Sequence, residues 1–175
     1  MYIAWSKKHS HYVLLDIMAH IPSVATIAEY FRLGIQTGLI QPENAIAWAD
    51  SEIAVAAPPA DGIIEVAWSR SPASTMEALL AVPGERDKQL AGRLLLGLLG
   101  KSDLNSEDAL EAAAKRALYI ARDAELGDET YAQFNAIDDL ISLASTKTYG
   151  TFEQCKSELT STLLHIAQGV QFPPI

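Results

Sequence analysis

The chain has a single cysteine, Cys155, among its 175 residues. A lone cysteine excludes an intramolecular disulfide, which is compatible with a reducing cytoplasm. Aromatic residues are also few, at 7%, whereas hydrophobic residues make up 49% of the chain and charged residues 20%. This composition is typical of folded globular proteins and excludes an intrinsically disordered chain. A chain of this length buries about 70% of the surface that it exposes when unfolded, so we expect a single helical domain over residues 1–175.

Long apolar runs are missing as well. The longest leucine-rich stretch, residues 90–99, is about half as long as the roughly 20 residues needed to span a bilayer, and it contains Arg93. Lys7 and Lys8 precede a short apolar run, but Asp16 interrupts it. A signal peptide needs an uninterrupted apolar segment of about 7 to 15 residues. We therefore expect no membrane segment, no export signal and a cytoplasmic location.

Basic residues are scarce, with 13 Lys and Arg against 22 Asp and Glu, giving a net charge of −9. Proteins that bind phosphate backbones draw most of their affinity from Lys and Arg, so we expect no nucleic-acid partner. The acidic balance instead favours encounter with basic proteins. Residues 103–139 alone hold ten acidic and three basic side chains, a net charge of −7. This segment is the first place to look for a binding surface.

Alternating runs of β-branched residues are rare, and helix start and stop signals are frequent. The sequence therefore predicts an all-α fold: a compact multi-helix domain of about eight or nine short to medium helices, with stacked helical hairpins as an alternative arrangement. Ser23 is placed to cap a helix that ends at Gly38, and Pro42 fits the first turn of the next. Either Ser106 or Asn105 is placed to cap one later helix, and Asp128 is placed to cap the next. The remaining helix patterns cover residues 85–99, 106–124, 128–145 and 151–169.

One short segment fits two kinds of secondary structure, and two capping boxes mark further helix starts. Residues 62–69 suit a strand as well as a short buried helix, and we prefer the helix because no second strand is evident to pair with it. Ser74 and Glu77 have the spacing of a capping box, as do Thr151 and Gln154. The sequence thus predicts helices that start at each of these boxes.

One motif looks like the end of a phosphate-binding loop. Gly100, Lys101 and Ser102 match the last three positions of the pattern G-x-x-x-x-G-K-S/T, but Leu95 stands where its first glycine belongs. We interpret the three residues as a helix stop followed by polar turn residues.

Metal ligands are sparse. His9 and His11 flank one residue and could both reach a single ion, yet zinc needs three or four protein ligands and Cys155 is remote in sequence. The sequence therefore predicts no metal and no cofactor.

The last helix carries two side chains of chemical interest. Cys155 falls on its apolar face, so we expect a core residue. His165 falls on the opposite face with Glu158 and Ser161. A small helical enzyme that uses His9, His11 or His165 with carboxylates gathered by the fold is one alternative function.

Half of the acidic residues in the segment 103–139 have a local structural role. Glu107 and Asp108 lie in a first helical turn, and so do two acids at the start of the following helix, where the helix dipole favours negative charge. Glu111 has Lys115 four residues later as an ion partner. These acids need no binding partner to explain them.

Asp138 and Asp139 have no such local role, because they lie in mid-helix. Helical spacing places them opposite an apolar stripe and beside an exposed tyrosine. Tyrosine is enriched in protein interfaces, and acidic neighbours would select a basic partner. The predicted partner-binding residues are Tyr131, Asn135, Asp138, Asp139 and Ser142, with Tyr119 and Asp123 on a comparable side of the preceding helix.

Residues 38–40 (GLI) and 45–50 (AIAWAD), followed by the proline pair 58–59 and residues 63–65 (IIE), resemble small all-helical bacterial proteins, among them immunity proteins of contact-dependent and polymorphic toxin systems. The resemblance implies a cytoplasmic inhibitor that binds one toxin domain and performs no chemistry.

The leading hypothesis from the sequence is therefore a non-catalytic protein-binding protein, in its most concrete form an immunity protein whose acidic helical surface covers a basic toxin domain. The alternatives are the small helical enzyme and an adaptor or structural subunit. An adaptor would be favoured by an exposed apolar patch.

Overall fold

The computed structural model describes residues 22–170, and this part of the chain folds into eight helices with no strand. The all-α prediction is confirmed. The first four helices are α2 (Val24–Gln36), α3 (Pro42–Val55), α4 (Ile63–Trp68) and α5 (Pro72–Ala81). The other four are α6 (Lys88–Leu99), α7 (Glu107–Asp123), α8 (Asp128–Ser145) and α9 (Phe152–Ile166).

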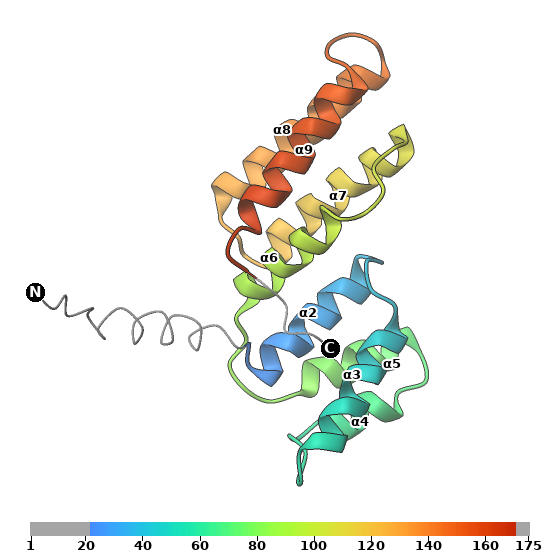
Figure 1. The fold of residues 1–175 in the computed structure, drawn as a ribbon, viewed down its shortest axis with the longest axis vertical. Coiled ribbons are helices and arrows are strands. Elements are labelled where there is room, and N and C mark those ends of the chain that lie inside the picture. Colours follow the sequence, from blue (N-terminus) through green and yellow to red (C-terminus); the bar gives the residue numbers. More distant parts are fainter. Residues whose placement is uncertain (1–21, 171–175) are drawn as a thin grey trace, which may run out of the picture.

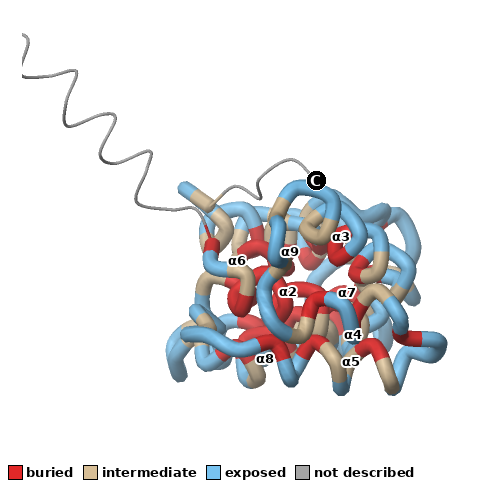
Figure 2. Tube along the Cα trace, turned by 90° about the horizontal axis from the view of Figure 1, so that it is seen from below, coloured by how far each residue is buried: buried red, intermediate tan, exposed pale blue. Residues whose placement is uncertain are grey.

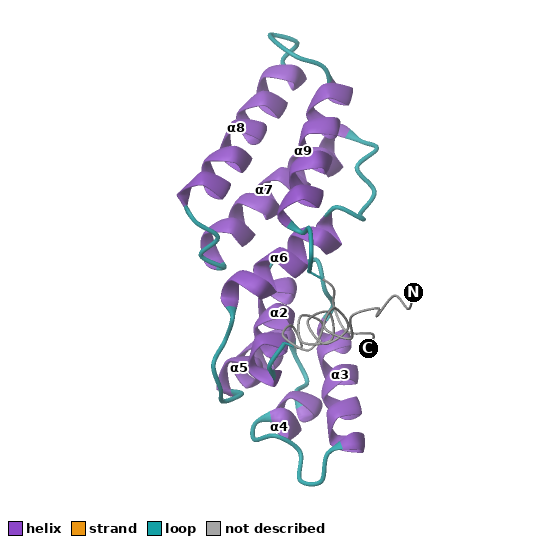
Figure 3. Ribbon diagram, turned by 60° about the vertical axis from the view of Figure 1, so that its left-hand side comes forward, coloured by secondary structure: helices purple, strands orange, loops and turns teal. Residues whose placement is uncertain are grey.

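The helices form two groups along the long axis of the molecule (Figure 1). α2 to α5 pack together at one end. At the other end α6 packs against α7 and α9, and α8 closes the ring between them, so α6 to α9 make a four-helix bundle. α2 packs against α6 and thereby joins the two groups. Short loops connect successive helices (Figure 3), and α8 and α9 lie side by side in both views.

The core is one connected cluster of buried residues that passes through both groups (Figure 2). In the first group Phe31 stacks on Trp48, with 5.2 Å between ring centroids, and both side chains are buried. In the bundle Phe134, Leu159 and Leu163 are fully buried. Aromatic and leucine side chains of this size each contribute about 1.5–3 kcal/mol when they leave water, so this cluster supplies the main driving force for folding.

Most helix starts follow the predicted capping chemistry. Ser23 Oγ accepts the Thr26 N–H at 3.1 Å, and Ser106 Oγ accepts the Ala109 N–H at 3.2 Å. The capping box of Thr151 is present at the start of α9. Residues 62–69 are helical as preferred, because α4 occupies most of them and its Ile63 and Val66 side chains are buried in the core.

Two helix starts differ from the prediction. The cap of α5 is Ser71, not Ser74: Pro72 occupies the first helical position, and Ser74 is the third residue, which returns its hydroxyl to the cap. α6 begins at Lys88 rather than near Glu85, because the Asp87 side chain accepts the Leu90 N–H at 2.8 Å and caps the helix there.

Two further boundaries shift by a few residues. Gly127, not Asp128, is the N-cap of α8. Asp128 is the first helical residue, where the helix dipole stabilises its negative charge. α9 ends at Ile166, before the turn that contains Gly169. Neither change alters which faces of these helices are buried.

Candidate functional site

The α8 helix is the most acidic surface element of the bundle. It carries four carboxylates and no Lys or Arg in its 18 residues. It packs on α7 and α9 (Figure 3). Its Phe134, Ile137 and Ile141 side chains point into the core, with 0%, 4% and 6% of their surface exposed. This apolar stripe fixes which α8 residues face away from the core.

The five α8 residues singled out from the sequence lie outside this buried stripe. Asn135, Asp139 and Ser142 are exposed, Asp138 is half-buried, and Tyr131 keeps 41% of its surface accessible. We call these five residues, Tyr131, Asn135, Asp138, Asp139 and Ser142, the α8 face. The structure brings them together on one helix, as the spacing requires.

The two aspartates of the α8 face make hydrogen bonds within their own helix but are not paired with a basic side chain in any salt bridge of residues 22–170. Asn135 Nδ2 donates to Asp139 Oδ2 at 3.4 Å, and Ser142 Oγ donates to the Asp138 backbone oxygen at 3.1 Å. Within residues 22–170 neither aspartate carboxylate forms a salt bridge. Lys115 on α7 feels the charge of Asp138. Its pKa is raised chiefly by the Glu111 carboxylate to which it donates a hydrogen bond, with a smaller contribution from Asp138.

Tyr119 and Asp123 lie elsewhere, against α2. Asp123 Oδ2 accepts a hydrogen bond from Arg32 at 3.0 Å, and the Tyr119 hydroxyl accepts one from Gln36. The Arg122 guanidinium lies over the Tyr119 ring, 5.0 Å from its centroid. These two residues therefore contact the junction between the two helix groups, whereas the α8 face does not.

A buried ion network at this junction was missed by the sequence reasoning. Glu29 on α2 is 3% exposed, and its carboxylate accepts hydrogen bonds from Arg32 at 2.6 and 3.0 Å and from Arg86 at 3.3 Å. Arg86 also donates to the backbone oxygens of Leu79, Leu80 and Val82 at the end of α5. The network thus ties together α2, α5, α7 and the loop before α6.

The network governs the ionisation of Glu29. Burial by itself raises the pKa of this carboxyl, but the hydrogen bonds and charge of Arg32, helped by Arg86 and Lys88, outweigh burial and lower the pKa. Glu29 also raises the pKa of Arg32 through the hydrogen bonds between them. Each charge is paired, so the network is a structural element. No local sequence pattern predicts this network, because two of its directly bonded members, Arg32 and Asp123, are 91 residues apart.

The surface between α8 and α9 forms a groove of about 590 Å³. His165, Glu158 and Ser161 line it together, as the helical spacing of the last helix predicted. Ser161 Oγ donates to the Glu158 backbone oxygen at 3.0 Å, which is a contact within its own helix. The other lining residues are Gln133, Ala136, Ile137, Leu140 and Thr162.

Cys155 is one of the residues that line a smaller cavity, of about 220 Å³, between α7, α8 and α9. The thiol is fully buried, and burial raises its pKa. Cys155 is a core residue, as predicted. Carboxylates of the α7 start, among them Glu107 and Glu111, line the same cavity.

The remaining motifs add no site to the described part of the chain. Gly100 caps the end of α6, and Ser102 Oγ donates to the Leu99 backbone oxygen at 2.7 Å, so these residues form a helix stop, as interpreted. Among residues 22–170 no group of three or more His, Cys, Asp or Glu side chains is arranged to hold a metal ion. His9 and His11 lie outside the described residues. None of the eight described helices has the length and apolar character that crossing a membrane requires.

Comparison of the chain with protein-family models, with characterised proteins and with solved structures finds no match.

Proposed function

We propose that this chain is a non-catalytic protein-binding protein whose α8 face binds a basic partner. The observation that carries the proposal is a charge imbalance on an exposed helix: four carboxylates, no Lys or Arg, and no salt bridge to Asp138 or Asp139 within residues 22–170. Unpaired like charges on one helix repel each other, and a basic partner relieves that repulsion.

The position of Tyr131 supports the same proposal. Its ring is 41% exposed at the start of α8, beside Arg122 and Asp128. A tyrosine supplies a large contact area and a polar hydroxyl, and residues of this kind often dominate the binding energy of an interface. The α8 face thus combines an aromatic anchor with the charges that select a basic partner.

The resemblance to immunity proteins gives the proposal its most concrete form. In that form the chain acts in the cytoplasm and covers the basic active site of one toxin domain, by steric and electrostatic occlusion. The test is co-expression with the C-terminal domain of a large secreted protein encoded directly upstream. Rescue of growth supports an immunity function. A domain that stays toxic in the presence of the chain contradicts it.

The binding proposal itself is tested without knowing the partner. A photo-crosslinking amino acid replaces Asn135 on α8 in one variant and the exposed Ala47 on α3 in a matched control. We expect a discrete crosslinked protein with a basic surface from position 135 in living cells, and none from position 47. Equal products from both positions, or no product from position 135, would refute the use of the α8 face.

An adaptor function is the second candidate, because α4 exposes apolar side chains. Trp68 is 71% exposed, and Ile64, one turn earlier on the same flank, is 39% exposed. Exposed apolar residues that share a flank mark contact surfaces more often than scattered ones do. If this surface binds a subunit, Trp68→Ala abolishes the complex while charge reversal on α8 leaves it intact.

A further inference from the structure

We infer that the groove between α8 and α9 receives a basic amphipathic helix of the partner. The inference rests on the proposed function and names the element that the partner presents. The groove floor is apolar and comes from α8: Ala136, Ile137 and Leu140. The opposite wall is polar and comes from α9: Glu158, Ser161, Thr162 and His165.

The dimensions of the groove suit a helix. Gln133 and Leu140 are seven residues apart on α8, and Glu158 and His165 are seven residues apart on α9. At 1.5 Å per residue each wall is about 10 Å long, or two helical turns. A docked helix contacts such a groove through side chains at positions i, i+3 or i+4, and i+7, which span the same length.

Apolar surface continues beyond the groove itself. Leu143 follows Leu140 by three residues and is 41% exposed, and Leu164 follows Ser161 by three residues and is 56% exposed. Residues three apart are neighbours on a helix surface. These two leucines therefore extend the apolar contact available to the hydrophobic side of a docked helix.

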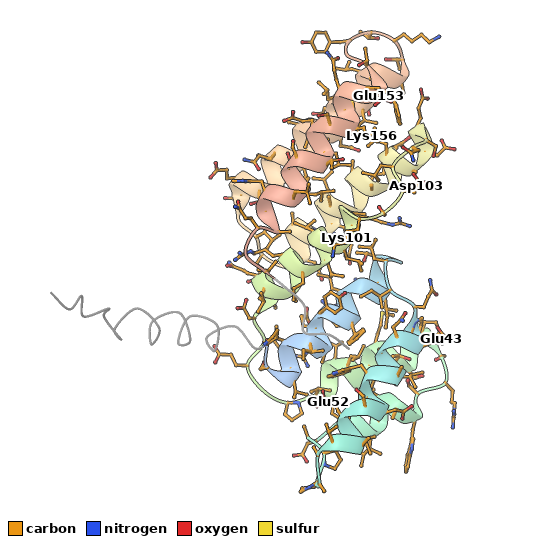
Figure 4. The ribbon with its side chains drawn as sticks, in the orientation of Figure 1. Glu43, Glu52, Lys101, Asp103, Glu153 and Lys156 are labelled. Carbon is orange, nitrogen blue, oxygen red and sulfur yellow. The ribbon has the colours of Figure 1, made fainter. Side chains whose placement is uncertain are left out.

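The charge around the groove selects a basic helix. Glu158 lines the α9 wall of the groove, and Asp139 precedes the lining residue Leu140 on α8 without itself lining the groove. The basic side chains of Lys156 on α9 and Arg93 on α6 do not line the groove. Lys156 donates a hydrogen bond to Asn105 at 2.5 Å, and Arg93 donates one to the Ile166 backbone oxygen at 3.3 Å. Figure 4 shows Lys156 on the α9 helix. An acidic helix would meet the like charge of Glu158, whereas Lys or Arg side chains would pair with it.

The probe for the test is a synthetic peptide of about 14 residues, made of Leu and Lys with helical spacing. Its control has the same composition in a scrambled order. Each peptide is titrated into the ¹⁵N-labelled full chain. We expect the amphipathic peptide to bind at least about tenfold more tightly than the scrambled one, with amide shifts concentrated at Ala136, Leu140, Ser161 and His165. Equal affinities, or shifts spread over all acidic segments, would overturn the inference.

Variants of the groove make the test independent of the peptide design. Ala136→Arg and Ser161→Arg both fill the groove and add a repelling charge at positions exposed to solvent, and Ala47→Arg on α3 is the matched control. We expect each groove variant to weaken the amphipathic peptide by about tenfold or more, with unchanged thermal unfolding, and Ala47→Arg to leave the affinity unchanged.

The double variant Asp138→Lys, Asp139→Lys separates this inference from the proposed function. If that variant weakens binding and the groove variants do not, the α8 face binds basic partners without a helix in the groove, and only the inference fails. If none of the variants changes the affinity, the proposed surface fails as well.

Discussion

Arg32 on α2 donates a hydrogen bond from Nη2 to Oδ2 of Asp123 on α7, at 3.0 Å, across 91 residues of sequence. The pair joins the two helix groups beside the buried Glu29 carboxylate, which binds the same guanidinium. The Asp123 side chain is 31% exposed, so solvent partly screens the attraction. Its main role is to hold α7 against α2, and this sets Asp123 apart from the unpaired carboxylates of the α8 face.

Asp123→Asn should lower the free energy of unfolding by about 1 kcal/mol, because it removes the charge from one hydrogen bond to Arg32. Urea denaturation of the two proteins measures the difference. The variant should bind the partner as tightly as the wild type does. If the variant had unchanged stability but bound the partner less tightly, Asp123 would be part of the partner-binding surface, as the sequence predicted.

Glu29→Gln should cost more, about 3 kcal/mol, because it leaves the charges of Arg32 and Arg86 partly uncompensated in a buried place. Denaturant unfolding at neutral pH measures it. Glu77→Gln, at an exposed mid-helix position on α5, is the matched control and should change stability by less than about 0.5 kcal/mol. Similar losses for both variants would show that the network contributes nothing specific.

The same carboxyl predicts how stability depends on pH. The pKa of Glu29 is lower in the folded chain than in the unfolded chain, so its contribution is complete above the unfolded value. The contribution is lost as the pH falls below about 4.5 and through the lower folded pKa. The stability difference between wild type and Glu29→Gln should therefore shrink on acidification. A difference that stays constant down to about pH 2 would contradict the lowered pKa.

Gly92 lets α6 approach the end of α7, because a methyl group added there would overlap the side chain of Ala124. Gly92→Ala should therefore destabilise the protein by about 1–3 kcal/mol, although alanine is the better helix former. Gly100→Ala is the control, since its added carbon would meet Leu163 at an ordinary 3.5 Å. Thermal unfolding of both variants decides the point: equal midpoints would mean that the α6 and α7 contact tolerates the extra methyl.

The parts of the fold that follow from local chemistry could be predicted from the sequence. Ser23, Ser106 and Thr151 cap helices through atoms three residues away, and such spacing is visible in the chain itself. Ser71 and Ser74 show where this reasoning is ambiguous, because both serines suit a cap. Pro72 decides between them, since proline fits the first helical position.

The parts that depend on distant contacts could not be predicted. The spacing of Phe134, Ile137 and Ile141 was enough to place the α8 face on the surface. It was not enough to separate Asp123 from that face, because Arg32 reaches Asp123 only once α2 has packed beside α7. The α8–α9 groove could not be predicted for the same reason. No local sequence pattern links Ala136 with Glu158, and only the packing of the two helices places both in one groove.

The central claim, that the α8 face binds a basic partner, is tested most directly by charge reversal. The variant Asp138→Lys, Asp139→Lys is compared with Asp50→Lys, Glu52→Lys on α3, which changes the net charge equally; Figure 4 shows Glu52 on the helix group remote from α8. Neither pair of acids forms a salt bridge within residues 22–170, so both variants should keep their helicity.

The measurement is the affinity of each variant, by calorimetric titration, for the protein captured from position 135. The account predicts a loss of at least about 30-fold for the α8 variant, since two charge reversals remove attraction and add repulsion, and a change of less than about threefold for the α3 control. Equal losses in the two variants, or no loss in the α8 variant, would contradict it.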